Sequence, residues 1–546
     1  MGRRWVAAVA GTAVAWTAVL MLAPTTAGAR GSRTTTTTRH VTTATRPATT
    51  TTRPVTTTTR PATTTTNQPA TTTSTTQPAT TTSTAPATTT TQPAPTTTTP
   101  LPPATIAEWL TTGDQASLMA PQPALRFGAP VVGNAQTITV SDASTYQTMT
   151  GFGVLISDSS AWLLAQLPAA TRDHLLTSLF GPGGLSVVRI ALGSSDYVVG
   201  QPYSYDDMPP GGSDPTLARF SIARDESYLI PLLRAVRAIK PSVRILASPW
   251  SAPGWMKTGG SLIGGTLNTS SEGAYAAYLV RALQSYAADG VPIDALTVQN
   301  EPEYSPADYP GMTLTESQEA DLVAEYLGPA LRASAPGTAL VGYDHNWSDT
   351  TYPASLLADP DAGPYLAGVA FHCYAGDVSA QTLVHNGAPS AAIWFTECSG
   401  GSWSAGFAAD LVWETRNIFV GAPENWATAV VWSNLALDAT GGPRSGGCSG
   451  CRGVVTVDPT AGTVTTNVEF WALGQASTAL ESGALRVASS TFGNGNLESA
   501  AYRNPDGSHA LEVVNSGTTP RTFQIQAASR STPVTLPGGA VATFRW

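Results

Sequence analysis

Residues 294–301 read Asp-Ala-Leu-Thr-Val-Gln-Asn-Glu, and this stretch carries the pattern that decides the fold. Its apolar centre has the length and composition of a buried β-strand, and it ends in an amide and a carboxylate. Similar runs recur along the chain, with helical patterns between them at 225–240, 272–289 and 315–333. The eight expected strands are residues 148–156, 185–192, 243–250, 294–301, 339–346, 368–374, 391–399 and 427–436.

This alternation of strands and helices predicts a parallel sheet. The crossover helices cover the faces of such a sheet, so its strands are buried and appear in the sequence as short apolar runs. Eight units over about 290 residues fit a closed barrel. We therefore expect an α/β fold with a (β/α)8 TIM barrel at residues 148–474. A doubly wound open sheet is the alternative, but no Gly-x-Gly-x-x-Gly motif follows a strand in this sequence.

The residues on either side of this barrel have a different pattern. Residues 475–546 contain short strand-like runs at 485–490, 498–503, 510–515, 521–527 and 540–546, separated by turn signals such as Asn-Pro-Asp-Gly at 504–507. Runs of this kind build an antiparallel β-sandwich. Residues 105–147 are similar in character. We therefore expect both ends of the globular region to form one side β-sandwich.

The first 104 residues are typical of export and spacer segments. Arg3 and Arg4 precede an apolar stretch at 5–22 and Ala-Gly-Ala at 27–29, which indicates a signal peptide at 1–29. A membrane anchor is the alternative, whereas cleavage would leave no stable membrane span. Residues 30–104 are rich in Thr and Pro and have few side chains that can pack, so we expect a disordered stalk and a candidate for O-glycosylation. We then expect the protein to be secreted, either extracellular or associated with the cell wall. The stalk is expected to hold the enzyme away from the cell wall, with an inert linker as the alternative.

The distribution of charge limits the partners. The chain has a formal net charge of −9, and the first 104 residues contain eight Arg and no acidic residue, so residues 105–546 carry −17. An acidic surface of this kind repels the phosphates of nucleic acids and of anionic membranes. The globular part is therefore expected to bind a neutral ligand and no nucleic acid.

Four cysteines lie in the second half of the chain, at Cys373, Cys398, Cys448 and Cys451. The spacing of the last two fits half of a zinc site, but no second Cys-x-x-Cys and no nearby pair of His completes it. In an exported protein, disulfides or free thiols are the better interpretation. We expect no metal site and no cofactor, since the sequence also has no phosphate-binding loop.

Two glutamates close apolar runs at the ends of the fourth and seventh expected strands, Glu301 and Glu397. Barrel enzymes place their chemistry at the C-terminal ends of the strands. Either glutamate alone fits a salt bridge at the barrel rim equally well, but the two together favour catalysis. Glycoside hydrolysis needs such a pair, about 5–5.5 Å apart in enzymes that retain configuration, with one carboxyl protonated. Asn300 fits a contact to the sugar 2-hydroxyl, or a cap of the loop.

Seven ordered stretches between 105 and 546 resemble glycoside hydrolase family 30, which includes glucosylceramidases and endo-β-1,6-glucanases. The resemblance implies a (β/α)8 barrel with a side β-sandwich from both chain ends, and hydrolysis with retention. The stretches are Gly-Phe-Gly at 151–153 with Ser-Asp at 157–158, Val-Arg-Ile at 188–190 with Ser-Asp-Tyr at 195–197, Ala-Ser-Pro-Trp-Ser-Ala-Pro-Gly-Trp-Met-Lys-Thr at 247–258, Asn-Glu-Pro at 300–302, Phe-His-Cys-Tyr at 371–374, Thr-Glu-Cys-Ser-Gly-Gly at 396–401 and Asn-Leu-Ala-Leu at 434–437.

The resemblance also assigns roles to individual residues. It implies that Glu301 is the acid/base, that Glu397 is the nucleophile and that Asn300 holds the 2-hydroxyl. The other expected substrate-binding residues are Arg189, Asp196, Trp250, His372, Tyr374 and Trp432. Several have a structural alternative, such as an ion pair for Arg189 or a place in the core for Trp250 and His372.

The sequence departs from the family pattern near the expected pocket. Cys373 stands where glucosylceramidases have Trp, which leaves space or lets it approach Cys398 on the neighbouring strand. Ser433 intervenes between Trp432 and Asn434, which puts the role of Trp432 in doubt, and residues 446–453 form an added loop. We expect a hydrolase of β-glucosidic linkages, in β-1,6-glucan or in a glycolipid resembling glucosylceramide. The alternatives are a β-xylosidase or β-fucosidase specificity, or a carbohydrate-binding surface protein without catalysis.

Overall fold

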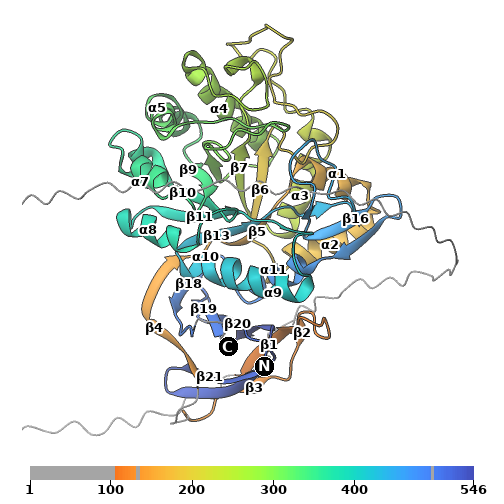
Figure 1. The fold of residues 1–546 in the computed structure, drawn as a ribbon, viewed down its shortest axis with the longest axis vertical. Coiled ribbons are helices and arrows are strands. Elements are labelled where there is room, and N and C mark those ends of the chain that lie inside the picture. Colours follow the sequence, from red (N-terminus) through yellow and green to blue (C-terminus); the bar gives the residue numbers. More distant parts are fainter. Residues whose placement is uncertain (1–104, 131–135, 493–496) are drawn as a thin grey trace, which may run out of the picture. The chain divides into compact units, whose positions relative to one another are not determined.

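The computed structural model describes residues 105–130, 136–492 and 497–546 (Figure 1). The expected signal peptide at 1–29 and stalk at 30–104 lie outside these residues. Within the described ranges, no helix is both long and apolar enough to cross a membrane.

Eight parallel strands close into a barrel, in which the last strand pairs with the first. The predicted (β/α)8 barrel is confirmed, and the open doubly wound sheet is wrong. β8 is shorter than the apolar run that predicts it, because residues 298–301 leave the strand before the run ends. The strands are β5 (Gly151–Leu155), β6 (Val187–Leu192), β7 (Arg244–Pro249), β8 (Ala295–Thr297), β9 (Ala339–Asn346), β10 (Leu366–His372), β11 (Ala392–Glu397) and β13 (Ala427–Trp432).

Helices surround the barrel and begin where the sequence provides caps. Thr315 and Gln318 form a capping box at the start of α5, with each side chain hydrogen-bonded to the other residue's backbone N–H. A turn of π-helix, Val323–Leu327, separates α5 from α6 and divides the helix expected at 315–333. The helices are α1 (Asp158–Gln166), α2 (Ala169–Phe180), α3 (Leu229–Ile239), α4 (Glu272–Ala288), α5 (Glu316–Leu322), α6 (Gly328–Ser334), α7 (Thr351–Ala358), α8 (Ser379–Gly387), α9 (Phe407–Glu414), α10 (Gly421–Glu424) and α11 (Val468–Thr478).

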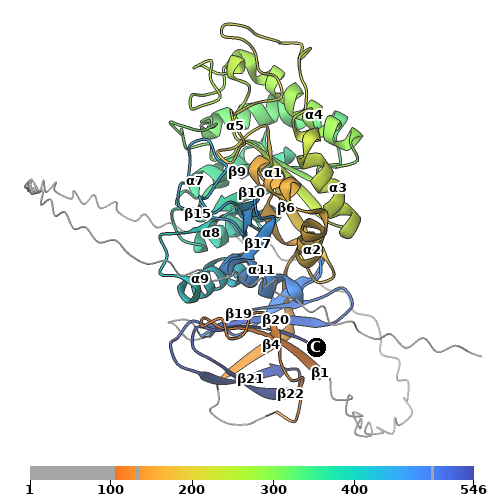
Figure 2. The same cartoon turned by 90° about the vertical axis from the view of Figure 1, so that its right-hand side faces the viewer.

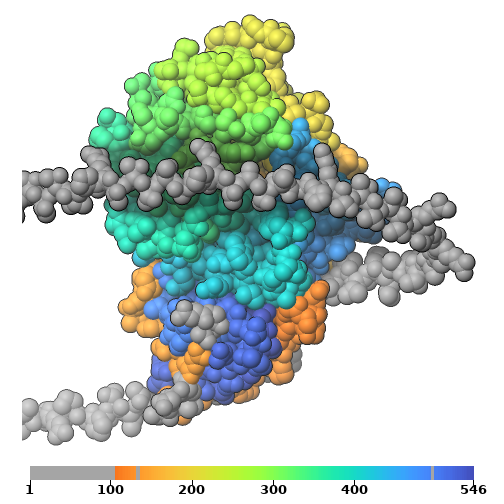
Figure 3. All heavy atoms as spheres, in the orientation of Figure 1, coloured from red at the N-terminus to blue at the C-terminus, as the bar shows by residue number. Residues whose placement is uncertain are grey.

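A β-sandwich is built from both ends of the described chain, as predicted. β1 pairs with β23, and β4 lies between β18 and β21. The first and last described segments therefore lie side by side in the space-filling view (Figure 3). The main strands are β1 (Thr105–Thr111), β4 (Thr137–Thr148), β18 (Leu485–Ala488), β19 (Leu497–Arg503), β20 (His509–Asn515), β21 (Arg521–Ala527), β22 (Arg530–Leu536) and β23 (Val541–Arg545).

β22 is a strand that the sequence pattern did not predict. It contains Pro533, which removes a backbone donor and weakens the strand signal. The structure tolerates this proline because β22 lies at the edge of its sheet, where among the described residues its outer side makes only an isolated bridge, from Ser531 to Gly128.

Helix α11 connects the barrel to the sandwich. Gln475 Nε2 donates to Thr111 Oγ1 at 2.8 Å, and Thr543 Oγ1 donates to Gln475 Oε1 at 2.7 Å. This glutamine therefore ties β1 and β23 to the helix. Both views place α9 and α11 between the barrel strands and the sandwich (Figures 1 and 2).

All four cysteines form disulfides, which resolves the choice between disulfides and free thiols. Cys373–Cys398 joins the ends of β10 and β11. Cys448–Cys451 closes a tight turn in the loop that follows β13.

Gly153 allows β5 and β6 to approach each other in the barrel wall. A Cβ added there would lie 2.2 Å from the carbonyl oxygen of Val187 and 2.6 Å from its Cβ. We predict that Gly153→Ala lowers the free energy of unfolding by about 1–3 kcal/mol, because the strands must shift apart. Thermal unfolding measures the change. Gly259→Ala is the control, since an added Cβ has no atom within 4 Å there, and equal melting temperatures for the two variants would contradict the prediction.

Candidate active site

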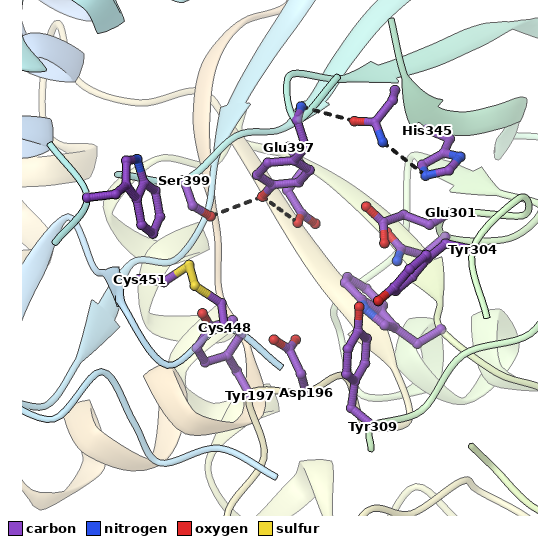
Figure 4. Close-up of a pocket in the computed structure, with 15 residues that line it drawn as sticks. Asp196, Tyr197, Glu301, Tyr304, Tyr309, His345, Glu397, Ser399, Cys448 and Cys451 are labelled. Atoms are coloured by element: carbon purple, nitrogen blue, oxygen red, sulfur yellow. Dashed lines mark hydrogen bonds between the residues drawn. A yellow bond between two sulfur atoms is a disulfide. The ribbon is translucent and has the colours of Figure 1, made fainter. Parts of the chain in front are cut away.

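A cavity of about 350 Å³ opens at the C-terminal ends of the barrel strands and has fifteen lining residues (Figure 4). Glu301, Glu397 and Asp196 point into this space. Six of the nine sequence-predicted site residues line it, namely Asp196, Trp250, Asn300, Glu301, Tyr374 and Glu397.

The two glutamates reach the cavity from strands β8 and β11. Glu397 is the last residue of β11, while Glu301 follows β8 and has a φ of 50°, a backbone conformation that costs about 1–2 kcal/mol in a residue other than Gly. A carboxylate oxygen of each glutamate lies within 4.8 Å of one on the other. The side chains are 15% and 14% exposed, so both carboxylates are shielded from bulk water and still open to a ligand.

Arg189 on β6 lies fully buried beneath the cavity and contacts the nucleophile candidate and its neighbours. Its guanidinium donates to a carboxylate oxygen of Glu397, to Asn300 Oδ1 at 2.7 Å and to Asp344 Oδ2 at 2.8 Å. It also lies 4.9 Å from the centroid of the Trp250 ring. Burial lowers the pKa of Arg189, but the charges of Asp344 and Glu397 outweigh it and raise the pKa above its usual value. The predicted residue is therefore a permanent cation under the site.

Asp344 is the residue at the centre of this network that the sequence analysis missed. It is fully buried on β9 and accepts hydrogen bonds from Arg189, from Thr396 Oγ1 at 2.6 Å and from Thr297 Oγ1 at 2.7 Å. Burial alone would raise the pKa of Asp344, but Arg189 and His372 hold it well below its usual range. The signal that could have found it is the polar run Asp-His-Asn at 344–346, which ends an otherwise apolar strand.

His372 connects Asp344 to Glu301. Its Nε2 lies 3.0 Å from Asp344 Oδ1 and its Nδ1 lies 3.2 Å from Glu301 Oε1. Burial lowers the pKa of His372, but these two carboxylates outweigh it and raise the pKa to about 9. Burial raises the pKa of Glu301, and the hydrogen bond and charge of His372 more than reverse this, so that the pKa of Glu301 is lowered. The pair therefore keeps its shared proton on the imidazole.

The same geometry bears on metal binding. Glu301, His372 and Glu397 bring three potential ligand atoms within 4.8 Å of one another. Both ring nitrogens of His372 face carboxylates and act as donors when the ring is protonated, which leaves no lone pair for a metal ion. The arrangement therefore suits proton transfer better than metal coordination.

Tyr374 and Asp196 complete the walls near the glutamates. Tyr374 Oη donates to Glu397 Oε1 at 2.8 Å and lies 3.0 Å from Ser399 Oγ. Asp196 is partly buried, and its burial and the charges of Glu397 and Glu301 raise its pKa to about 8. Below that pH it is a neutral carboxyl that can both donate to and accept from a sugar hydroxyl.

Trp432 has a different position from the other predicted residues. It is fully buried, its ring lies 5.7 Å from that of Phe419, and it lines a neighbouring cavity. Arg189 and His372 likewise lie under the cavity surface, where they act through the glutamates. The remaining lining residues were not predicted as binding residues, because most of them lie in loops, which have no periodicity. They are Tyr197, Tyr304, Tyr309, His345, Asn346, Ser399, Trp403, Cys448 and Cys451.

Comparison with known proteins gives two family matches that follow the two parts of the fold. The glycosyl hydrolase family 30 TIM-barrel domain matches residues 149–480, and the family 30 β-sandwich domain matches residues 483–544. A solved endo-β1,6-glucanase has a TM-score of 0.76 and 29% identity, with 81% of this chain and 99% of that chain covered.

Curated relatives support the same family. An endo-1,6-β-D-glucanase of Neurospora crassa is 35% identical over 412 residues, which cover 72% of this chain and 84% of that protein. A putative glucosylceramidase 2 of Caenorhabditis elegans is 32% identical over 426 residues, which cover 72% and 80%. The chain therefore belongs to glycosyl hydrolase family 30 and is a glycoside hydrolase.

Proposed function

We propose that the chain hydrolyses β-1,6-glucan with retention of configuration, with Glu397 as nucleophile and Glu301 as acid/base. The observation that carries this proposal is the separation of the two carboxylates, whose oxygens approach within 4.8 Å. Retaining enzymes have carboxyl groups about 5–5.5 Å apart, whereas inverting enzymes need about 6.5–9.5 Å to admit a water molecule.

In the first step, a Glu397 oxygen attacks the anomeric carbon as the bond to the leaving oxygen breaks. Arg189 and Tyr374 hold the two oxygens of Glu397, which fixes the direction of attack. The leaving oxygen takes a proton from Glu301, and His372 at 3.2 Å supplies that proton to Glu301. A glycosyl ester on Glu397 and a released alcohol are the products of this step.

In the second step, water attacks the same carbon and displaces Glu397. Glu301 now accepts a proton from the water and shares it again with His372, which restores the starting state. Two inversions at one carbon give net retention.

Asn300 is positioned to read the sugar between the glutamates. Arg189 Nη2 donates to its Oδ1 at 2.7 Å, which fixes the orientation of the amide. Nδ2 then remains as a donor toward the sugar 2-hydroxyl, a contact that strengthens as the oxocarbenium ion develops.

The preference for β-1,6-glucan rests on the relatives, while the charge of the cavity supports a neutral sugar in general. Endo-1,6-β-D-glucanases from three fungi are 35%, 34% and 31% identical to this chain, compared with 32% for the nematode glucosylceramidase. Three acidic side chains in one cavity suit a neutral sugar. Glucosylceramide is the second candidate, and aryl β-xylosides and β-fucosides test the other specificities.

We also propose that the protein is exported, with a signal peptide at 1–29 and a stalk at 30–104 that spaces the enzyme from the cell wall. Both pairs of cysteines form disulfides, which persist in oxidising compartments outside the cytosol.

We predict that Glu397→Gln lowers kcat/KM on β-1,6-glucan by about 1,000-fold or more, because no nucleophile remains. Glu301→Gln should lose about 100- to 10,000-fold on the glucan but much less on an aryl β-glucoside, whose leaving group needs little protonation. Release of reducing sugar and of the aryl alcohol measures the two activities. Glu226→Gln is the control, since this glutamate is exposed and does not line the cavity.

The stereochemistry of the first product gives an independent check. Proton NMR during turnover should show the β-anomer before mutarotation. The α-anomer as first product, or wild-type activity in Glu397→Gln, would contradict the assignment of the two glutamates.

We predict that Asp196→Asn stabilises the protein at pH 7 by about 1–2 kcal/mol while it reduces activity. The pKa of Asp196 is raised to about 8 in the folded protein. Between pH 4 and 8 its carboxyl is therefore ionised in the unfolded chain but protonated in the folded protein. The stability of the wild type consequently falls as the pH rises through that range. Denaturant unfolding at pH 4 and pH 7 should show the gain only at the higher pH. A gain of equal size at both would show that the charge is not its cause.

A further inference from the structure

A second cavity, of about 470 Å³, adjoins the catalytic one. The two cavities share Tyr374, Ser399 and Trp403 as walls, so they lie directly on either side of these residues. The remaining walls come mainly from the loop after β11 and from α9, which have no part in the mechanism above. The volume lies within the range of about 300–1,000 Å³ that is typical of ligand pockets.

Two exposed tryptophans stand along this second cavity. Trp403 is 62% exposed and Trp413 is 46% exposed, although tryptophan is usually well buried. The loop that carries Trp403 is held in place, because Ser402 N–H donates to Gly450 O at 2.8 Å and β12 (Gly400–Gly401) pairs with β15 (Cys451–Arg452). Flat aromatic faces on a rigid support suit the apolar faces of sugar rings.

The cavity also contains a buried carboxyl group that lacks a partner. Glu414 is 1% exposed, and within the described parts of the chain neither of its carboxylate oxygens has a hydrogen-bond partner. Nε1 of the buried Trp432, in the same wall, likewise has no partner among the described residues. Unpaired buried polar groups of both kinds are rare in native structures and require an explanation.

The surroundings of Glu414 indicate what kind of ligand fits. Burial raises the pKa of Glu414 well above its usual value, and the charges of Glu469 and Asp410 add to this effect. Arg452 opposes the shift, but its guanidinium is engaged by Asp410 at 2.6 Å and by Glu469 at 2.7 Å. A protonated carboxyl does not attract a cation, and it both donates and accepts hydrogen bonds, as sugar hydroxyls do.

We propose that this second cavity binds further glucose units of the glucan chain that is cleaved at Glu301 and Glu397. Trp403 and Trp413 stack on ring faces, and Glu414 and Trp432 Nε1 hydrogen-bond to hydroxyls. This inference rests on the proposed function and extends it from one sugar position to a run of several. Trp413 also borders a third hollow, which Gly517 and Gly539 of the sandwich line.

The test uses full-length Glu397→Gln, which binds substrate without cleaving it, and calorimetry with a β-1,6-linked glucose hexasaccharide and disaccharide. We expect the added change Trp413→Ala to weaken hexasaccharide binding roughly 3- to 10-fold and to leave disaccharide binding unchanged, because only the longer ligand reaches the second cavity. Glu414→Leu should weaken the hexasaccharide similarly, whereas Glu414→Gln keeps a donor and an acceptor and should bind it normally. Tyr326→Ala, which removes an aromatic ring that is 37% exposed and outside both cavities, is the matched control.

Unchanged hexasaccharide affinity in Trp413→Ala, or equal losses for both saccharides, overturns the proposal and leaves a water-filled cavity. A parent protein that binds no hexasaccharide overturns it as well. Hydrolysis of an aryl β-glucoside by the wild type reports separately on the proposed function. An inactive wild type with intact length-dependent binding overturns the catalytic assignment and supports the second cavity as a sugar site.

Discussion

The ion pair between Arg189 and Asp344 is the interaction on which the rest of the site depends. Both side chains are fully buried in the barrel, and removal of either would leave an uncompensated charge, a loss of about 3–5 kcal/mol. Each member of the pair then holds one of the two glutamates. Arg189 contacts Glu397 directly, and Asp344 acts on Glu301 through His372. One network thus places both carboxylates. It crosses the barrel, and its central pair, Arg189 and Asp344, is 155 positions apart in the sequence.

This arrangement makes the two glutamates chemically different although they are the same residue in the same cavity. Glu397 faces a guanidinium, which does not lose its proton in proteins. Glu301 faces an imidazolium, whose proton can move to it. A nucleophile must stay ionised and an acid/base must exchange a proton, so the network itself favours the roles that the family resemblance implies. Burial, with the charges of Glu397 and Glu301, raises the pKa of Asp196 to about 8, so the carboxyl beside the two glutamates is neutral below that pH.

The sequence predicted the barrel because each buried strand leaves an apolar run that ends in polar residues, and Glu301 and Glu397 stood out as such ends. It did not predict β22, because a strand tolerates a proline such as Pro533 only at a sheet edge. β22 lies at the edge because β21 pairs with β4 on its other side, and the sequence does not show this order of strands. Asp344 was missed for a similar reason. The polar run at 344–346 marks a strand end, but the importance of Asp344 comes from partners on other strands, Arg189, Thr396 and Thr297, which that run does not indicate. Tyr304, Tyr309 and Trp403 lie in loops, where side-chain direction follows neither a period of two nor of 3.6.

The loops that distinguish this chain are built separately from the catalytic floor. The ladder of β12 and β15, the Cys448–Cys451 disulfide and the bonds of Arg452 to Asp410 and Glu469 support Trp403 without contact to Arg189 or Asp344. Rigid scaffolds with variable loops allow binding preferences to change while the chemistry is kept. The added loop at 446–453 lines the catalytic cavity with Cys448 and Cys451, and its Gly450 carbonyl holds the loop of Trp403, which lines both cavities. A stiff support of this kind favours the binding of a long ligand, because binding then adds little cost in loop ordering.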